Sequence, residues 1–204
     1  MSTAEHDTAL RATLAGLRDL LRPRVRLQLA DDERLDGRTA LITGGNRGLG
    51  FGIAELLARR GARLILACRS GGDEAAARLR AITGNQAIEA LQVDVSERAS
   101  VAALVATLAE RGEALDRVIL NAAVVASESR TTSAGLDVMF HVNFLAVVDL
   151  VEQLLARRLM GPATRAPARI VVVSSEAHRS GKPALDRFRE PERYGTSGSL
   201  AQYG

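Results

Sequence analysis

A glycine-rich turn directly after a short apolar run constrains this chain more than any other feature. The segment Thr43-Gly44-Gly45-Asn46-Arg47-Gly48-Leu49-Gly50 follows the apolar run at 39–43 and opens a stretch with helical periodicity. Gly44 permits a tight turn, while Gly48 and Gly50 leave room for backbone N–H groups and a helix N-terminus to approach an anion. Because the turn sits between a strand and a helix, the pattern favours a phosphate-binding turn over a plain tight turn.

Short apolar runs alternate with helical periodicity from position 38 onward. The expected strands are 39–43, 64–68, 87–93, 118–121 and 169–174, and the expected helices are 49–60, 73–82, 97–111 and 133–160. Apolar strands separated by helices are typical of a parallel sheet covered on both faces, with right-handed connections. We therefore expect an α/β fold with a doubly wound, Rossmann-type parallel sheet in which five strands are visible.

Two flanking segments differ from this alternating region, which we take as a nucleotide-binding domain over residues 37–175. In residues 1–36, leucines recur at helical spacing between positions 10 and 21, before a break that contains proline. This predicts an amphipathic helix and a linker, and docking on its own domain or on a partner subunit is favoured over membrane attachment. Residues 176–204 form an irregular polar stretch, either a functional loop or a segment that awaits further elements.

Composition argues against several classes of function. The net charge of +3 comes from arginines interspersed with acidic residues, and aromatic residues make up only 3%, which argues against nucleic-acid binding. Cys68 is the only cysteine, so no internal disulfide is expected, and no apolar run approaches the roughly 18 residues of a membrane span. Without a signal pattern, we expect a cytoplasmic protein. The histidines, His6, His141 and His178, are too scattered for a metal site.

The end of the second apolar run bears on the choice of dinucleotide. Rossmann-type proteins that prefer NAD place an acidic residue there to hold the ribose hydroxyls. This chain has Cys68-Arg69-Ser70 at that place. Arg69 can pair bidentately with a 2′-phosphate, and Arg47 in the glycine turn adds a second cation. Either arginine alone could be an ordinary surface charge, but together they favour NADP(H) over NAD(H).

The spacing of the glycines, with three residues between Gly44 and Gly48, resembles that of the short-chain dehydrogenase/reductase family. The resemblance runs from about Asp36 to Tyr203 and implies the strand order 3-2-1-4-5, with later strands missing. It also implies hydride transfer between a nicotinamide ring and a carbonyl or alcohol carbon. The cofactor-binding residues that it implies are Gly44, Asn46, Arg47, Gly48, Leu49, Gly50, Arg69, Asp94, Val95, Asn121, Ala122 and Ala123.

Two short motifs after the third and fourth apolar runs carry part of this resemblance. The pair at 94–95 resembles the family's adenine-contacting pair, although Asp94 could instead be an acid at a helix N-terminus before Ser96. The motif at 121–123 resembles the family's Asn-Ala-Gly motif beside the nicotinamide ribose. Ala123 replaces the usual glycine.

The resemblance implies three catalytic residues. Asn143 matches an asparagine that supports a water-linked proton relay, and Ser175 matches the serine that hydrogen-bonds the substrate oxygen, with Ser174 as the alternative. Tyr203 matches the acid/base tyrosine at the extended spacing of the retinol-dehydrogenase-like branch. Tyr194 is the other candidate, but a glycine stands where the family's lysine should follow it.

That lysine matters because a tyrosine with its reference pKa, near about 10, is a poor acid or base at neutral pH. Counted from Tyr203 it would stand at position 207, beyond the last residue, and Lys182 precedes the tyrosine. We therefore expect the chain to be the front portion of a family member.

Two hypotheses about function follow. The first is an NADP(H)-dependent oxidoreductase that acts on a carbonyl or hydroxyl of a small, apolar molecule and could form a homo-oligomer. The second is a truncated, catalytically silent nucleotide-binding or interaction module, because the catalytic lysine is absent and the last strand would expose its edge.

Overall fold

Strands and helices alternate along residues 33–160 and 167–175, which the computed structural model describes. The strands are β1 (Thr39–Thr43), β2 (Arg63–Cys68), β3 (Ile88–Gln92), β4 (Arg117–Leu120) and β5 (Arg169–Val172). The helices are α2 (Gly48–Arg59), α3 (Gly72–Thr83), α4 (Arg98–Glu110), α5 (Val138–Phe140), the π-helical segment η1 (His141–Leu145) and α6 (Ala146–Ala156).

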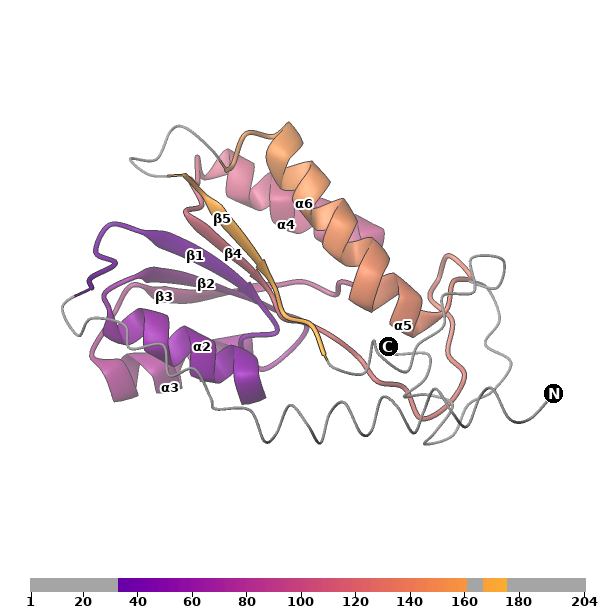
Figure 1. Cartoon of the computed structure of the whole chain (residues 1–204), viewed down its shortest axis with the longest axis horizontal. Coiled ribbons are helices and arrows are strands. Elements are labelled where there is room, and N and C mark those ends of the chain that lie inside the picture. Colours follow the sequence, from indigo (N-terminus) through magenta and orange to yellow (C-terminus); the bar gives the residue numbers. More distant parts are fainter. Residues whose placement is uncertain (1–32, 161–166, 176–204) are drawn as a thin grey trace, which may run out of the picture.

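The strands form one sheet in the order β3-β2-β1-β4-β5 (Figure 1). Every pairing in it is parallel, and residue 41 of β1 stands between residue 65 of β2 and residue 118 of β4. This confirms the Rossmann-type sheet and the strand order expected from the sequence. The order reverses between β1 and β4, and the carboxyl ends of strands at such a point are where open α/β sheets bind ligands.

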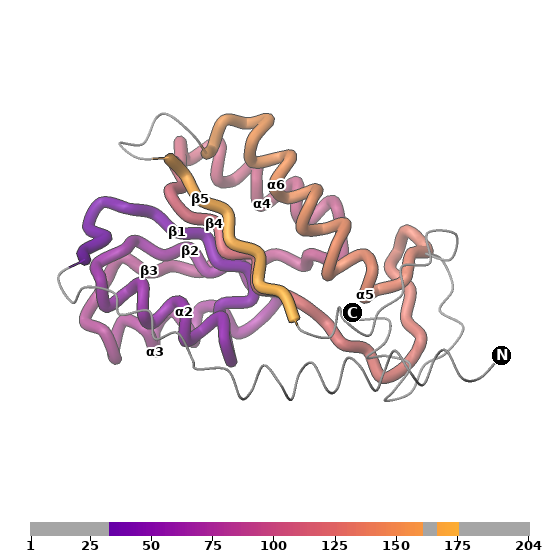
Figure 2. Tube along the Cα trace, in the orientation of Figure 1, coloured from indigo at the N-terminus to yellow at the C-terminus, as the bar shows by residue number. Residues whose placement is uncertain are grey.

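Helices cover both faces of the sheet. The chain trace shows α2 and α3 on one face and α4 with α6 on the other (Figures 1 and 2). Alternate side chains of one strand therefore enter different cores: Leu41 packs in the cluster that includes α4 and α6, whereas Ile42 packs in the cluster that includes α2 and α3. Both side chains are fully buried. The sheet is thus anchored at β1, the strand that carries the glycine turn.

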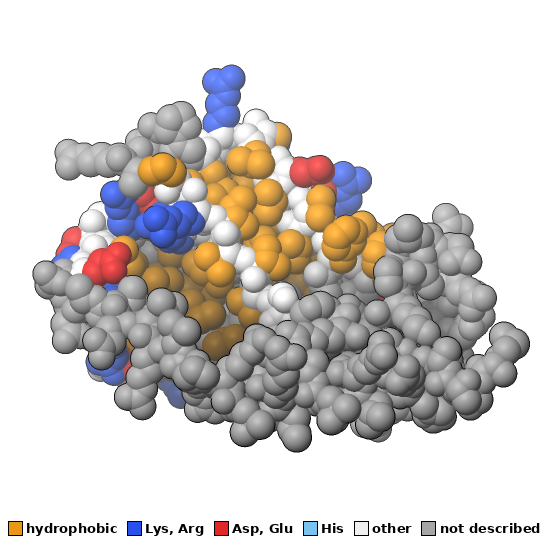
Figure 3. Space-filling view, in the orientation of Figure 1, with side chains coloured by type: hydrophobic (Ala, Val, Ile, Leu, Met, Phe, Trp, Pro, Cys, Tyr) orange, Lys and Arg blue, Asp and Glu red, His pale blue; other side chains and the backbone are white. Residues whose placement is uncertain are grey.

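The outermost strand, β5, is the least covered part of the sheet. Ile170, Val171 and Val172 are 39%, 47% and 54% exposed, and within the described residues no strand pairs with the outer edge of β5. Figure 3 shows hydrophobic side chains gathered over β5 and the neighbouring α6 on this side of the molecule. The exposed strand edge that was expected from the sequence is therefore present in the described chain.

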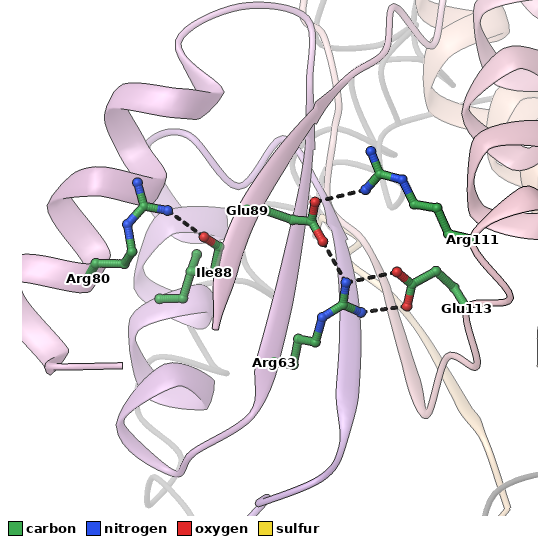
Figure 4. Close-up of polar contacts among 6 residues, drawn as sticks. All are labelled: Arg63, Arg80, Ile88, Glu89, Arg111 and Glu113. Atoms are coloured by element: carbon green, nitrogen blue, oxygen red, sulfur yellow. Dashed lines mark hydrogen bonds and ion pairs between the residues drawn. The ribbon is translucent and has the colours of Figure 1, made fainter. Parts of the chain in front are cut away.

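A charged network joins elements that lie far apart in the sequence (Figure 4). Arg63, the first residue of β2, pairs with Glu89 of β3 and with Glu113, which follows α4. Glu89 also pairs with Arg111 at 2.8 Å. The network holds β2, β3 and the end of α4 together.

The strand predictions agree with the structure within two residues at each end, but the last helix prediction was wrong. The expected helix over 133–160 begins only at Val138 and is divided into α5, η1 and α6. Its start is set by Asp137, whose Oδ1 accepts a hydrogen bond from the backbone N–H of Phe140 at 2.9 Å. The predicted helix began too early because the prediction rested on apolar periodicity, which does not reveal this cap.

The long helix also corrects the expectation that no apolar stretch has the length of a membrane span. The helical stretch Val138–Ala156 is 19 residues long with a mean hydropathy of 1.6, so by length and composition alone it could cross a membrane. In the structure its Leu150 and Leu154 are buried in the cluster that includes α4. A core helix passes the same test, so the helix is weak evidence for a membrane span.

Candidate functional site

The glycine turn connects the carboxyl end of β1 to the first turn of α2. Gly44 and Gly48 have φ angles of +66° and +56°, which side chains disfavour. Arg47 precedes the helix with an extended backbone and makes no capping hydrogen bond with its side chain. Consequently the Arg47 side chain does not occupy the first N–H groups of α2, which can act as donors to an anion at this helix end.

Gly50 is required by packing inside the protein. A Cβ atom at this position would collide with the carbonyl oxygen of Gly44 and would lie 2.5 Å from Asn121 Nδ2. The sequence predicted that Gly50 leaves space for a ligand, whereas the structure shows that it leaves space for the turn itself. The conclusion that the position needs glycine holds for this different reason.

A buried threonine fixes the glycine turn against the end of β4. Thr43 Oγ1 accepts hydrogen bonds from the backbone N–H groups of Asn121 and Ala122, both at 3.0 Å. In return, Asn121 Nδ2 donates to the carbonyl oxygens of Thr43 at 3.1 Å and Gly44 at 3.2 Å. This role of Thr43 was not predicted from the sequence. The available signal was a hydroxyl in the last position of an otherwise apolar strand.

The loop at 69–71, which follows β2, lies beside the glycine turn. Asn46 Nδ2 donates to the carbonyl oxygen of Ser70 at 2.9 Å. The side chain of Arg69 is 70% exposed, and its Nη1 lies 4.0 Å from Asp94 Oδ2. Arg47 is also exposed. Two arginines that are open to solvent therefore stand on adjoining loops, and a 2′-phosphate site formed by them stays a prediction.

Asp94 stabilises the turn that follows β3. Its Oδ1 accepts hydrogen bonds from the N–H and the hydroxyl of Ser96 at 2.9 and 2.6 Å. Partial burial acts to raise the pKa of Asp94, but the Ser96 hydrogen bonds and the charge of Arg69 together hold this pKa below its usual value. The N-cap of α4 is Glu97, and the alternative interpretation of Asp94, as an acid at this helix N-terminus before Ser96, stays a prediction. Adenine contact by Asp94 and Val95 stays a prediction.

Asn143 holds the segment after β4 with both ends of its amide. Its Oδ1 accepts from the N–H of Val124 at 2.9 Å, and its Nδ2 donates to the carbonyl oxygen of Val124 at 2.9 Å. Asn143 is part of η1, so the wide helical turn is tied directly to the segment that continues from 121–123. The structure thereby gives Asn143 a structural function, and its part in a proton relay stays a prediction.

Of the other two predicted catalytic residues, Ser175 is among the described residues and Tyr203 is not. Ser175 and Ser174 are exposed and follow β5, at the same sheet edge as the glycine turn, because the strands are parallel. Tyr203, like Tyr194 and Lys182, lies outside the described residues. Among the residues that are described, no group of three or more His, Cys, Asp or Glu side chains could hold a metal ion. The structure thus brings the predicted cofactor-binding residues to one edge of the sheet, and their role in binding stays a prediction; Tyr203 is not placed.

Comparison with known proteins agrees with this geometry. The family model described as short chain dehydrogenase matches residues 38–187, which is most of the chain. The chain therefore belongs to the short-chain dehydrogenase family of oxidoreductases. Within it, the chain resembles the retinol-dehydrogenase-like members. It is 40% identical over 159 residues to dehydrogenase/reductase SDR family member 13 of Bos taurus, and 35% identical over 171 residues to retinol dehydrogenase 13 of Homo sapiens.

These matches cover 77% and 82% of this chain but only 41% and 50% of the two relatives, so the chain spans half of their length or less. Among solved structures, the Pseudomonas aeruginosa RhlG/NADP active-site complex is similar, with a TM-score of 0.60 and 29% identity. That match covers 85% of this chain and 66% of the other.

Proposed function

We propose that the protein is an NADP(H)-dependent oxidoreductase, which transfers hydride to or from a carbonyl or hydroxyl of a small, apolar molecule. The observation that carries the proposal is the glycine turn, which hydrogen bonds between Thr43 and Asn121 hold against the end of β4. Arg47 in this turn and Arg69 in the adjoining loop add positive charge beside it. We expect the phosphates to bind at the first N–H groups of α2 and the adenosine end to lie over residues 69–71.

The choice of NADP(H) over NAD(H) rests on charge. The loop at 69–71, after β2, contains Arg69 and no acidic residue. A guanidinium group binds a 2′-phosphate well, whereas a carboxylate binds the ribose hydroxyls of NAD(H). The similar Pseudomonas aeruginosa structure is a complex with NADP, which supports the same choice.

The chemical roles follow from the family resemblance. NADP(H) would supply or accept the hydride. Ser175 would donate a hydrogen bond to the substrate oxygen, Tyr203 would give or take its proton, and Asn143 would support the proton relay. The apolar substrate class is proposed from the similarity to the retinol dehydrogenases.

An alternative function is a nucleotide-binding or interaction module without catalysis. The exposed β5 strand favours it, because a strand edge with apolar side chains is suited to pairing with another chain. Incubating the chain with NADPH and a panel of aldehydes and ketones separates the two proposals. Oxidation of NADPH above the substrate-free rate rejects the silent module, and its absence across the panel, in a chain that binds NADPH, rejects catalysis by this chain.

The cofactor proposal is tested with the Arg69→Ala variant. We expect NADPH to bind more weakly to it, by about tenfold for one lost charge-assisted contact, and NADH to bind with unchanged affinity. Arg59→Ala is the matched control, because Arg59 is a half-exposed arginine at the other end of α2. An unchanged preference for NADPH in Arg69→Ala would remove Arg69 from the site.

A further inference from the structure

The loop that carries Arg69 is anchored from both sides of β2. On the β1 side, Asn46 Nδ2 of the glycine turn donates to the carbonyl oxygen of Ser70 at 2.9 Å. On the β3 side, Gln92 Nε2 donates to the carbonyl oxygen of Arg69 at 3.3 Å. Two consecutive carbonyl groups are therefore held by side-chain amides from two different elements.

The contact made by Asn46 joins the two segments that carry arginine. Asn46 stands directly before Arg47 in the chain, and Ser70 stands directly after Arg69. This hydrogen bond therefore joins the two backbone segments from which both guanidinium groups extend. Gln92 contacts only one of these segments.

Both arginine side chains need this support from the backbone. The Arg69 side chain is 70% exposed, its ion-pair partner among the described residues is Asp94 at 4.0 Å, and Arg47 is exposed as well. Packing therefore does little to hold either guanidinium, so where each can reach depends on its backbone. Bidentate recognition of a phosphate tolerates little misplacement.

We propose that Asn46 is a positioning residue that sets the preference for NADP(H) over NAD(H) by holding the Arg47 and Arg69 segments at a fixed separation. The inference rests on the proposed function. Its specific consequence is that loss of the Asn46 amide weakens binding of the nucleotide with a 2′-phosphate and leaves the nucleotide without it almost unaffected.

The test is titration of NADPH and NADH into the full 204-residue chain and into its Asn46→Ala variant. We expect the Kd for NADPH to rise about threefold to tenfold, the effect of one lost hydrogen bond, and the Kd for NADH to change by less than about twofold. Gln86→Ala is the matched control. It removes another exposed amide, which donates to the carbonyl of Gly84 at 3.3 Å at the far end of α3, and should change neither Kd.

Two further variants keep the test decisive. Asn46→Asp cannot donate to Ser70 and places a negative charge beside Arg47, so it should weaken NADPH binding more than Asn46→Ala does. If thermal unfolding shows that neither Asn46 variant folds, Gln92→Ala should shift the preference in the same direction by a smaller factor.

The outcomes separate this inference from the proposed function. Equal weakening of both nucleotides, or an unchanged ratio of the two Kd values, overturns the positioning role while leaving NADP(H) binding intact. If the unaltered chain binds neither nucleotide, the proposed function fails, and the positioning role fails with it.

Discussion

Two glycines of α2 differ in what surrounds them, although both lie in the same helix. A Cβ at Gly50 would collide with the carbonyl of Gly44, whereas a Cβ at Gly52 would meet nothing within 4 Å. We expect Gly50→Ala to abolish nucleotide binding and lower the melting temperature, because the turn must move away from β4. Circular dichroism and nucleotide titration measure both effects.

Gly52→Ala is the control for that substitution. Alanine in a helix interior is more stable than glycine by about 0.5–1 kcal/mol, so this variant should bind nucleotide normally and melt at the same or a higher temperature. Parallel behaviour of the two variants would contradict the packing role that the structure gives to Gly50.

At the residue scale, the sequence predicted which positions gather at the site but not how they hold one another. Gly44 and Arg69 could be chosen because residue type and order after a strand are visible in the sequence. The bond between Asn46 and Ser70 joins residues 24 apart, and the bond between Asn121 and Thr43 joins residues 78 apart. Such contacts depend on the strand order and on side-chain geometry, which no local pattern encodes.

The clamp between Asn143 and Val124 ties a helix to the segment after β4. Asn143→Ala leaves a partly buried N–H and C=O without their partner, so we expect unfolding to become easier by about 2–3 kcal/mol. Urea denaturation measures this loss. Gln153→Ala, which removes one hydrogen bond that the side-chain amide donates to Asp149 within α6, should cost less than about 1 kcal/mol. An equal loss of unfolding free energy in the two variants would show that the contacts between Asn143 and Val124 stabilise the fold no more than an ordinary side-chain hydrogen bond does.

The charged network around Arg63 should contribute a modest, salt-dependent stability. Glu89 is about one-third exposed and pairs with two arginines, so Glu89→Gln should cost about 0.5–1 kcal/mol at low ionic strength. The cost should shrink in about 1 M salt, where screening extends over only a few ångströms. Urea denaturation of both proteins at low and high salt checks this, and a salt-independent difference would speak against a role based on charge.

At the element scale, strands were easier to predict than the last helix. The strands β1, β2 and β4 are short, mostly apolar runs that are followed by a glycine or polar residue, so their ends are visible in the sequence, whereas β3 includes Glu89 and Gln92. The region 133–160 reads as one apolar helical pattern, but the cap at Asp137 and the wide turn η1 interrupt it. The π-helical turn coincides with the tertiary contact of Asn143, which helical periodicity cannot reveal.

At the scale of the molecule, we expect self-association at the outer edge of β5, with which no strand of the described residues pairs. Val171→Lys places a charge on this edge and should shift sedimentation toward smaller species at high protein concentration. Leu155→Lys charges a similarly exposed residue on α6 instead. If Leu155→Lys reduces association and Val171→Lys does not, the contact lies on the helix face and not on the strand edge.

We expect NADP(H) to bind at the carboxyl edge of the sheet, where β1, β2 and β4 end. Hydrogen–deuterium exchange of the unaltered chain, with and without saturating NADPH, locates this site. We predict slower exchange at 43–50, 69–71 and 121–123, and unchanged exchange around Arg63 and Glu113 at the opposite end of the strands. Unchanged exchange in the glycine turn, or protection confined to another surface, would show that NADPH does not bind at this edge.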